Sequence, residues 1–197
     1  MLHASWRYFR LALALMFLTG GSTTLRADEM LWDALRRGTA VALIRHAEAP
    51  GFGDPPGFTL SDCATQRNLS EAGRTQARAI GAAFQKQGIG QAQVLSSRWC
   101  RCLETARLLQ LGPVTPLPSL DSFFTAPERG PPQTAQLRAD LTTSASPEGP
   151  RVLVTHQVNI TGLTGVSPRA GEVIVVKVPT DGEVTVLGRL DPSSARE

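Results

Sequence analysis

The chain has 197 residues, of which 42% are apolar and 19% are charged, and its formal net charge is +3. This length and composition indicate one globular domain and exclude a disordered chain. The charge is small and the arginines are scattered, so we expect no nucleic-acid partner, whereas a small anionic substrate would suit a slight basic excess.

The first 27 residues have the pattern of a secretory signal peptide. Arg7 and Arg10 precede an apolar run, Leu11 to Leu18, which is too short to cross a bilayer as a helix. Small and polar residues follow, and we expect the mature chain to begin at Asp28. An uncleaved anchor at a membrane surface is the alternative. Both interpretations place the domain outside the cytoplasm, periplasmic or secreted, and cleavage would leave no stable membrane anchor.

Helix and strand patterns alternate after this leader. Short runs rich in β-branched apolar residues predict strands, and apolar residues at helical spacing predict helices. The strands are expected at 39–44, 92–96 and 151–155, with an extended segment at 114–117. The helices are expected at 28–37, from the N-cap Ser70 to Gly88, at 99–109, at 134–143 and at 159–165.

The end of the chain has a different character. Residues 172–178 and 183–190 are rich in β-branched residues around the turn 179–182, which indicates a hairpin at a sheet edge. We therefore predict an α/β fold, a three-layer α/β/α sandwich with a mostly parallel mixed sheet and a C-terminal β-hairpin. The domain would span 28–191, with a tail at 192–197.

The mature chain would contain two histidines, and each directly follows a predicted strand. His46 comes after Arg45 at the end of the first strand, and His156 comes after the strand 151–155. Ligands of α/β proteins bind at the carboxyl ends of parallel strands, so this arrangement suits a phosphate site. Two unrelated structural histidines are the alternative. The aperiodic loop 46–69 is long for a compact domain, which indicates a functional loop.

Three cysteines suggest one disulfide in an oxidising compartment. The bridge would join Cys63 to Cys100 or Cys102 and leave one free thiol. A zinc site is the alternative, but a C-x-C pair with one distant cysteine and no spare histidine is poor ligand spacing. We therefore expect no metal.

Four short motifs resemble those of the histidine phosphatase (phosphoglycerate-mutase-like) superfamily. They are Ile-Arg-His-Ala-Glu at 44–48, Asn-Leu-Ser-Glu-Ala-Gly with Gln-Ala at 68–77, Ser-Ser with Arg and Glu-Thr-Ala at 96–106, and Val-Thr-His at 154–156. They follow the order and spacing of that family over about 39–165. The resemblance implies a phosphatase that requires no metal and no cofactor.

The resemblance also implies a role for each matching residue. His46 would attack phosphorus and form a phosphohistidine, which divides one slow step into two easier ones. Arg45 and Arg101 would clamp the phosphate oxygens with paired N–H donors. His156, preferably cationic, would stabilise the charge of the equatorial oxygens. The alternatives to Arg101 on the same predicted helix are Arg98 and Arg107.

A general acid is also needed to protonate the leaving alkoxide. Such a carboxyl requires a pKa raised by an apolar setting. The family places it after the arginine helix, where Asp121 stands beside Phe123 and Phe124 and is our first choice. Glu128 is the second choice and Glu48 a distant third.

Together these features predict an exported phosphoric monoester hydrolase for a small phosphorylated substrate, with phosphosugars or lipopolysaccharide-core phosphates suggested by the resemblance. Two alternatives stay open. One is a catalytically inactive phosphate-binding domain of the cell envelope. The other is a phosphohistidine-protein phosphatase, since small family members of that kind need no leaving-group acid. The sequence leaves the natural substrate and the oligomeric state open.

Overall fold

The structure, a computed structural model, describes residues 20–143, 149–178 and 183–192. Its centre is a six-stranded sheet with the strand order β3-β2-β4-β1-β5-β6. The first four strands of this order are parallel, β5 runs antiparallel to β1, and β6 runs antiparallel to β5. The strands are β1 (Val41–Arg45), β2 (Gln93–Ser96), β3 (Val114–Pro116), β4 (Arg151–Thr155), β5 (Val173–Lys177) and β6 (Thr185–Leu190).

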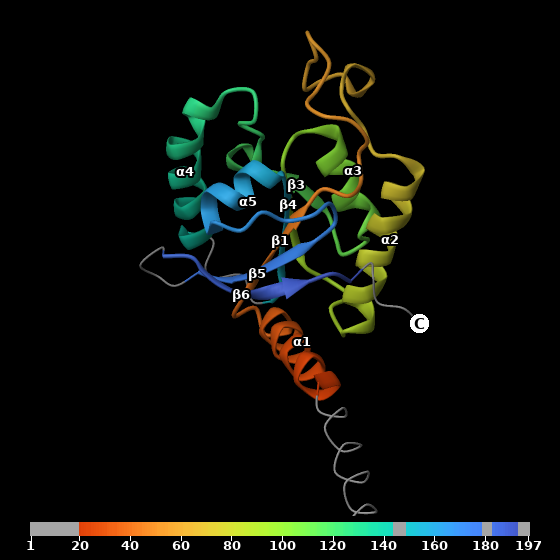
Figure 1. Cartoon of the computed structure of the whole chain (residues 1–197), viewed down its shortest axis with the longest axis vertical. Helices are drawn as coiled ribbons and strands as arrows, with labels where there is room; N and C mark the ends of the chain where they lie inside the picture. The colour runs from red at the N-terminus through yellow and green to blue at the C-terminus, as the bar shows by residue number, and fades with distance from the viewer. Residues whose placement is uncertain (1–19, 144–148, 179–182, 193–197) are drawn as a thin grey trace, which may run out of the picture.

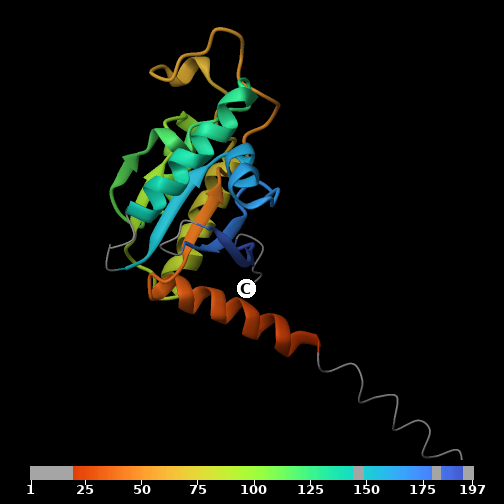
Figure 2. The ribbon, with the colours of Figure 1, turned by 90° about the vertical axis from the view of Figure 1, so that its left-hand side faces the viewer.

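Helices cover both faces of the sheet (Figures 1 and 2). One face packs against α1 (Gly20–Arg36), α2 (Glu71–Lys86) and α3 (Cys100–Leu108), and the other against α4 (Gly130–Thr143) and α5 (Gln157–Thr164). Alternate residues of β1 enter the two cores, Ala42 and Ile44 on one side and Val41 and Leu43 on the other, as the period of a strand requires. The predicted three-layer α/β fold is confirmed, including the antiparallel β5–β6 pair. The turn 179–182 lies outside the described residues.

The observed elements differ from the predicted ones mainly at helix starts. Helix α4 begins at Gly130 rather than Thr134, because Pro131 and Pro132 lie in its first turn, where a missing N–H breaks no helical hydrogen bond. Helix α5 begins at Gln157, two residues before its predicted start at Asn159. Helix α1 begins at Gly20 and runs through the predicted cleavage position. Residues 1–19, which hold most of the predicted signal peptide, lie outside the described part.

Between Gly20 and residue 192, within the described ranges, no helix has the length and apolarity needed to cross a membrane. Three short 3-10 helices complete the fold. They are η1 (Cys63–Thr65), η2 (Pro118–Leu120) and η3 (Pro127–Arg129).

The register of the central strands brings three strand ends together. Arg45 of β1 pairs with Thr155 of β4, and Ser96 of β2 pairs with Val154 of β4. The residues that follow these strands therefore meet at one edge of the sheet. The loop 46–69 rises from the same edge, and α1 lies at the opposite end of the molecule (Figures 1 and 2).

Candidate active site

A pocket opens at the carboxyl ends of β1, β4 and β2. It holds about 600 Å³ of empty space, open solvent at its mouth included. The ionisable side chains that line it are Arg45, His46, Asp54, Arg67, Arg101 and His156. Four of these six were predicted from the sequence. Arg98 and Arg107, the two alternatives to Arg101, do not belong to the lining.

His46 is held in the form that a nucleophile requires. Its ring is 3% exposed, and its Nδ1 lies 2.8 Å from the carbonyl oxygen of Ala47. A carbonyl can only accept, so Nδ1 carries the proton and the lone pair of Nε2 is free. Burial lowers the pKa of His46 to about 3; the hydrogen bond to Ala47 opposes this shift, and the charges of Arg101, Arg67 and Arg45 add to it. The imidazole is therefore neutral at pH 7.

Two of the motif residues hold the backbone behind this histidine. The Ala47 N–H donates to Thr105 Oγ1 at 3.1 Å, and the Glu48 N–H donates to Gln76 Oε1 at 3.0 Å. Thr105 belongs to α3 and Gln76 to α2, so each helix fixes one peptide of the segment that leaves β1. These side chains orient His46 and do not belong to the pocket lining.

His156 faces His46 across the pocket, with the two ring centroids 5.5 Å apart. Its Nδ1 lies 3.4 Å from Arg101 Nη2, which can only donate, and its Nε2 lies 2.9 Å from Ser97 Oγ. We therefore assign the proton to Nε2. Burial, together with the charges of nearby arginines, lowers the pKa of His156 well below its ordinary value. The expectation of a cationic His156 is thus not met before a phosphate dianion is present to favour the charged form.

Two arginine N–H donors indicate that this pocket binds an anion. The Nε atoms of Arg45 and Arg101 are buried and have no hydrogen-bond partner among the described residues. Buried donors without partners are rare and costly, because desolvation is not compensated. An oxyanion bound between them would supply the missing acceptors.

Arg67 is a third pocket arginine, and sequence reasoning missed it. Its Nε donates to the carbonyl of Gly53 at 2.7 Å, and its Nη1 donates to the carbonyl of Ala49. It stands directly before the second motif, and that position was the one available signal. In an aperiodic loop, nothing else in the sequence distinguishes Arg67 from a solvated arginine.

Asp54 is the second pocket residue that was not predicted. Its carboxylate accepts from Arg101 at 2.7 and 3.2 Å, from Trp99 Nε1 at 3.0 Å and from the Arg67 backbone N–H at 3.1 Å. Burial raises the pKa of Asp54, but the hydrogen bonds and charge of Arg101 outweigh burial and the pKa is lowered. One carboxylate among three arginines leaves two net positive charges, which match a phosphomonoester dianion.

The surroundings of Asp121 do not support its predicted role as the general acid. Its buried carboxylate accepts from Arg98 Nε at 2.7 Å and from the Arg98 backbone N–H at 2.9 Å, and it does not line the pocket. Ser97 Oγ donates to it at 3.3 Å and stands between it and His156. Within the described part of the chain, Asp121 is therefore linked to His156 through Ser97. Glu128 is exposed and Glu48 contacts Ser70, so neither alternative lines the pocket.

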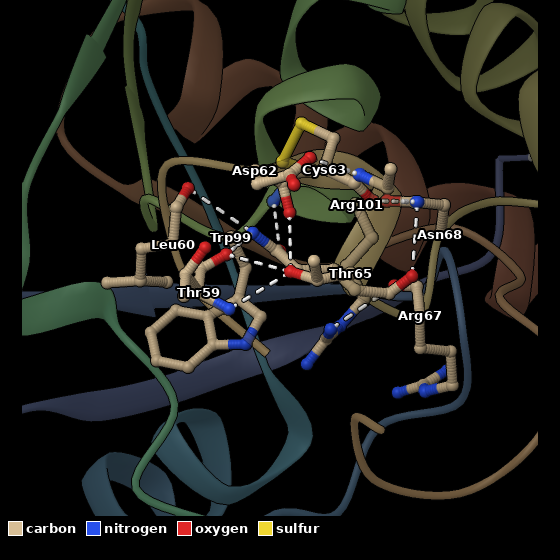
Figure 3. Close-up of a disulfide and its surroundings, with 12 residues drawn as sticks. Thr59, Leu60, Asp62, Cys63, Thr65, Arg67, Asn68, Trp99 and Arg101 are labelled. Atoms are coloured by element: carbon tan, nitrogen blue, oxygen red, sulfur yellow. Dashed lines mark hydrogen bonds between the residues drawn. A yellow bond between two sulfur atoms is a disulfide. The ribbon is translucent and has the colours of Figure 1, made fainter. Parts of the chain in front are cut away.

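The predicted disulfide is confirmed and joins Cys63 to Cys100, the first residue of α3 (Figure 3). Beside it, the Gln66 side chain accepts from the Cys100 N–H at 3.0 Å and donates to the Thr59 carbonyl at 2.9 Å. The loop 46–69 is thus tied to α3 next to the residues that supply Arg67 and Arg101. The bridge removes two cysteines from the alternative zinc site.

Cys102 is the free cysteine and is buried beside His156, with 3.4 Å between Sγ and Nε2. Burial raises the pKa of its thiol to about 12. The thiol is therefore protonated at pH 7 and is no nucleophile in this state.

A comparison with known families agrees with this geometry. The model of the histidine phosphatase superfamily (branch 1) matches residues 41–126, which is less than half of the chain but includes His46 and Arg101. His156 lies beyond the matched segment. No curated protein matches the sequence.

Solved structures of phosphatases share the fold. The protein histidine phosphatase SixA, solved with tungstate, is 18% identical with a TM-score of 0.56, over 80% of this chain and 99% of SixA. A mycobacterial glucosyl-3-phosphoglycerate phosphatase is 18% identical with a TM-score of 0.53, over 71% and 92% of the two chains. A phosphoserine phosphatase from Entamoeba histolytica is 17% identical with a TM-score of 0.54, over 76% and 95%. Likeness at this level of identity shows the fold alone.

Proposed function

We propose that this chain is a histidine phosphatase that hydrolyses a phosphomonoester through a phosphohistidine intermediate on His46. One observation carries the proposal: a neutral imidazole with a free Nε2 faces a pocket in which two buried arginine donors lack partners. The net charge of the pocket suits a dianion. The match of the family model over 41–126 supports the same assignment.

In the first half-reaction, His46 Nε2 attacks phosphorus. A nitrogen–phosphorus bond forms, the ester oxygen–phosphorus bond breaks, and the alkoxide leaves with the electron pair and takes up a proton from solvent water. Arg45, Arg101 and Arg67 stabilise the oxygens that carry the transition-state charge. His156 faces the same oxygens as a neutral group or as a cation once the dianion is bound. In the second half-reaction, water attacks phosphorus, the nitrogen–phosphorus bond breaks, and inorganic phosphate leaves.

A phosphohistidine-protein phosphatase is a second candidate, and one observation favours it. Asp54 is the carboxylate among the described lining residues, and its two oxygens accept from Arg101, Trp99 and the Arg67 backbone. An anion held this way is a poor proton donor. A phosphoramidate, which leaves as an imidazole, depends less on a leaving-group acid than an alkyl ester does.

We further propose that the protein is exported, as a periplasmic or secreted enzyme. The leader pattern in residues 1–27 supports export, and a disulfide fits an oxidising compartment. Export would place the substrate outside the cytoplasm.

Trapping the phosphoenzyme tests the proposal. The purified protein is incubated with p-nitrophenyl phosphate, quenched, and analysed for phosphate that is acid-labile and base-stable. We expect the wild type to release p-nitrophenol and to retain acid-labile phosphate, and we expect His46→Ala to do neither. His156→Ala is the matched variant, because it removes the other pocket histidine. His156→Ala should retain the acid-labile phosphate on His46 while turning over more slowly.

Turnover that survives in His46→Ala would refute the phosphohistidine mechanism. A folded wild-type protein that binds phosphate without any turnover would favour the inactive phosphate-binding domain instead. Faster release of phosphate from a phosphohistidine peptide than from alkyl phosphates would favour the second candidate.

A further inference from the structure

Two exposed phenylalanines meet at the mouth of the pocket. Phe52 comes from the loop 46–69, and Phe124 comes from the segment between η2 and η3. Their ring centroids are 4.8 Å apart with the planes nearly perpendicular, and both residues line the pocket. An edge-to-face contact of this kind joins the two loops across the opening.

Folding alone does not explain these side chains. Phe52 is 87% exposed and Phe124 is 39% exposed, so the first ring leaves most of its apolar surface in water and the second more than a third. Among the described residues, the other exposed large apolar side chains are Met30 and Leu187, which lie on α1 and β6 and not at the pocket. Exposed apolar surface gathered at a pocket rim is typical of a ligand contact.

The charged side chains of the lining are its less exposed members. His46, Arg101 and His156 are buried and Arg45, Asp54 and Arg67 are half-buried, whereas the exposed residues of the described lining are all neutral, namely Gly51, Phe52, Phe124 and Thr125. None of these exposed residues carries a charge that could recognise a carboxylate or an amine on the leaving group. The chemistry of the rim therefore favours an uncharged leaving group with a flat apolar face.

The backbone on either side of Phe52 has a conformation that favours glycine. Gly51 and Gly53 flank Phe52 with φ values of 90° and 69°, in the left-handed region. Arg67 Nε donates to the Gly53 carbonyl at 2.7 Å, so the loop is held beside a pocket arginine. In this conformation the Phe52 ring lies at the pocket mouth against Phe124.

We propose that Phe52 and Phe124 form a leaving-group subsite that binds the uncharged ring of a phosphomonoester. The ring carries the phosphate on one side and stacks against the two phenylalanines while the arginines hold the phosphate. This inference rests on the proposed function and narrows its substrate class. Aromatic rings and sugar rings share the required flat C–H or π face, and open-chain phosphorylated acids and amino acids lack it.

Binding of phosphonates tests the subsite without turnover, because their carbon–phosphorus bond cannot be hydrolysed. Calorimetry would compare phenyl-, cyclohexyl-, methyl- and 2-carboxyethylphosphonate with the wild type, the double variant Phe52→Ala/Phe124→Ala and the control Leu187→Ala. We expect at least one ring compound to bind about tenfold more tightly than methylphosphonate, the order expected for stacking on aromatic side chains. The carboxyethyl compound should gain nothing. Phenyl and cyclohexyl compounds distinguish an aromatic ring from a saturated, sugar-like ring.

The affinity ratio of ring compound to methylphosphonate is the decisive quantity. It should fall to near one in the double variant and stay unchanged in Leu187→Ala. An unchanged ratio in the double variant, equal affinity of all four phosphonates, or no binding of any would overturn the subsite. Ring-selective binding by a wild type that never hydrolyses p-nitrophenyl phosphate would instead refute the proposed function and leave the subsite standing.

Discussion

His46 and His156 are both held neutral, and the contacts that hold them differ. His46 donates Nδ1–H to a backbone carbonyl, which leaves Nε2 free toward the pocket. The nitrogens of His156 both have side-chain partners, Arg101 on one and Ser97 on the other. A nucleophile needs a free lone pair, and a group that stabilises charge needs a fixed N–H. The free Nε2 of His46 thus fits the role proposed for it, whereas the N–H of His156 is directed at Ser97 in this structure.

Asp121→Asn should slow substrates with good and poor leaving groups by a similar factor, on the order of tenfold for the loss of one charge-assisted contact. The reason is that Asp121 reaches His156 only through Ser97 and does not line the pocket. The measurement is kcat/KM for p-nitrophenyl phosphate and for phenyl phosphate. The ratio of the two values should equal that of the wild type.

Ser97→Ala is the matched variant for this prediction, because it interrupts the same contact and leaves the ion pair between Arg98 and Asp121 in place. It too should leave the ratio unchanged, and the double variant should be no slower than the slower single variant. A much larger loss with phenyl phosphate in Asp121→Asn alone would restore Asp121 as the general acid.

The residue scale also shows where sequence reasoning stops. His46, His156, Arg45 and Arg101 could be placed because each follows a strand or begins a helix in a recognisable motif. Arg67 and Asp54 lie in the aperiodic loop 46–69, where residue type does not reveal direction. Both reach the pocket because hydrogen bonds and the Cys63–Cys100 bridge fold that loop back onto α3, and no periodic pattern encodes such a path.

Helix α2 contacts the segment behind His46 at a glycine. The Cβ of any other residue at Gly73 would lie 2.0 Å from the carbonyl oxygen of Glu48, and that same oxygen accepts from the Ser70 N–H. The glycine of this motif therefore serves a close backbone approach, not a turn. It allows the first turn of α2 to hold the chain as it leaves β1.

Gly73→Ala should lower both stability and activity, because the helix must move away from Glu48 and carry Gln76 with it. We expect a loss of about 1–3 kcal/mol in the free energy of unfolding, the range typical of overpacking. Urea denaturation and p-nitrophenyl phosphate turnover provide the measurements.

Gly90→Ala is the control, since a Cβ at Gly90 meets nothing within 4 Å. It should change the free energy of unfolding by less than about 0.5 kcal/mol, as surface substitutions usually do. Equal effects of the two substitutions would contradict a specific role for the close approach at Gly73.

At the scale of elements, the predicted order of helices and strands is confirmed, and α2, whose buried residues recur at helical spacing, is the clearest example. The N-cap at Ser70 is also confirmed, with the Gly73 N–H donating to Ser70 Oγ at 2.9 Å. Helix starts were less well predicted. Prolines that usually mark a break stand inside the first turn of α4, and helix α1 continues upstream through the predicted cleavage position.

The whole molecule explains why two histidines far apart in sequence become neighbours. Four adjacent parallel strands place the ends of β2, β4 and β1 side by side. The antiparallel pair β5–β6 extends the sheet on the side of β1 away from β4. The strand order could not be read from the sequence, because the central strands β1 and β4 are buried on both faces and their continuous apolar runs carry no register signal. The motifs along the chain predicted which residues would meet, but not the order of the strands that bring them together.

The pH dependence of stability is a property of the whole fold. In the unfolded chain, each histidine binds a proton with a pKa near 6.5, whereas the folded protein lowers the pKa of His46 to about 3 and lowers that of His156 well below 6.5. The unfolded state therefore binds more protons as the pH falls below 6.5, and stability must fall with it. For His46 the loss should be about 2–3 kcal/mol between pH 6.5 and 4.5, from about 1.4 kcal/mol for each pH unit, and His156 should add a loss of the same sign.

Urea denaturation at several pH values from 7.5 to 4.5 measures this slope. The double variant His46→Asn/His156→Asn should flatten it, and each single variant should reduce it. The measurements stop at pH 4.5, because Asp54 and Glu172 also have a lowered pKa and add a loss of stability of the same sign at lower pH. A slope that persists unchanged in the double variant would show that the two histidines are not held neutral by the fold. The free lone pair on His46, on which the proposed chemistry depends, would then lack its physical basis.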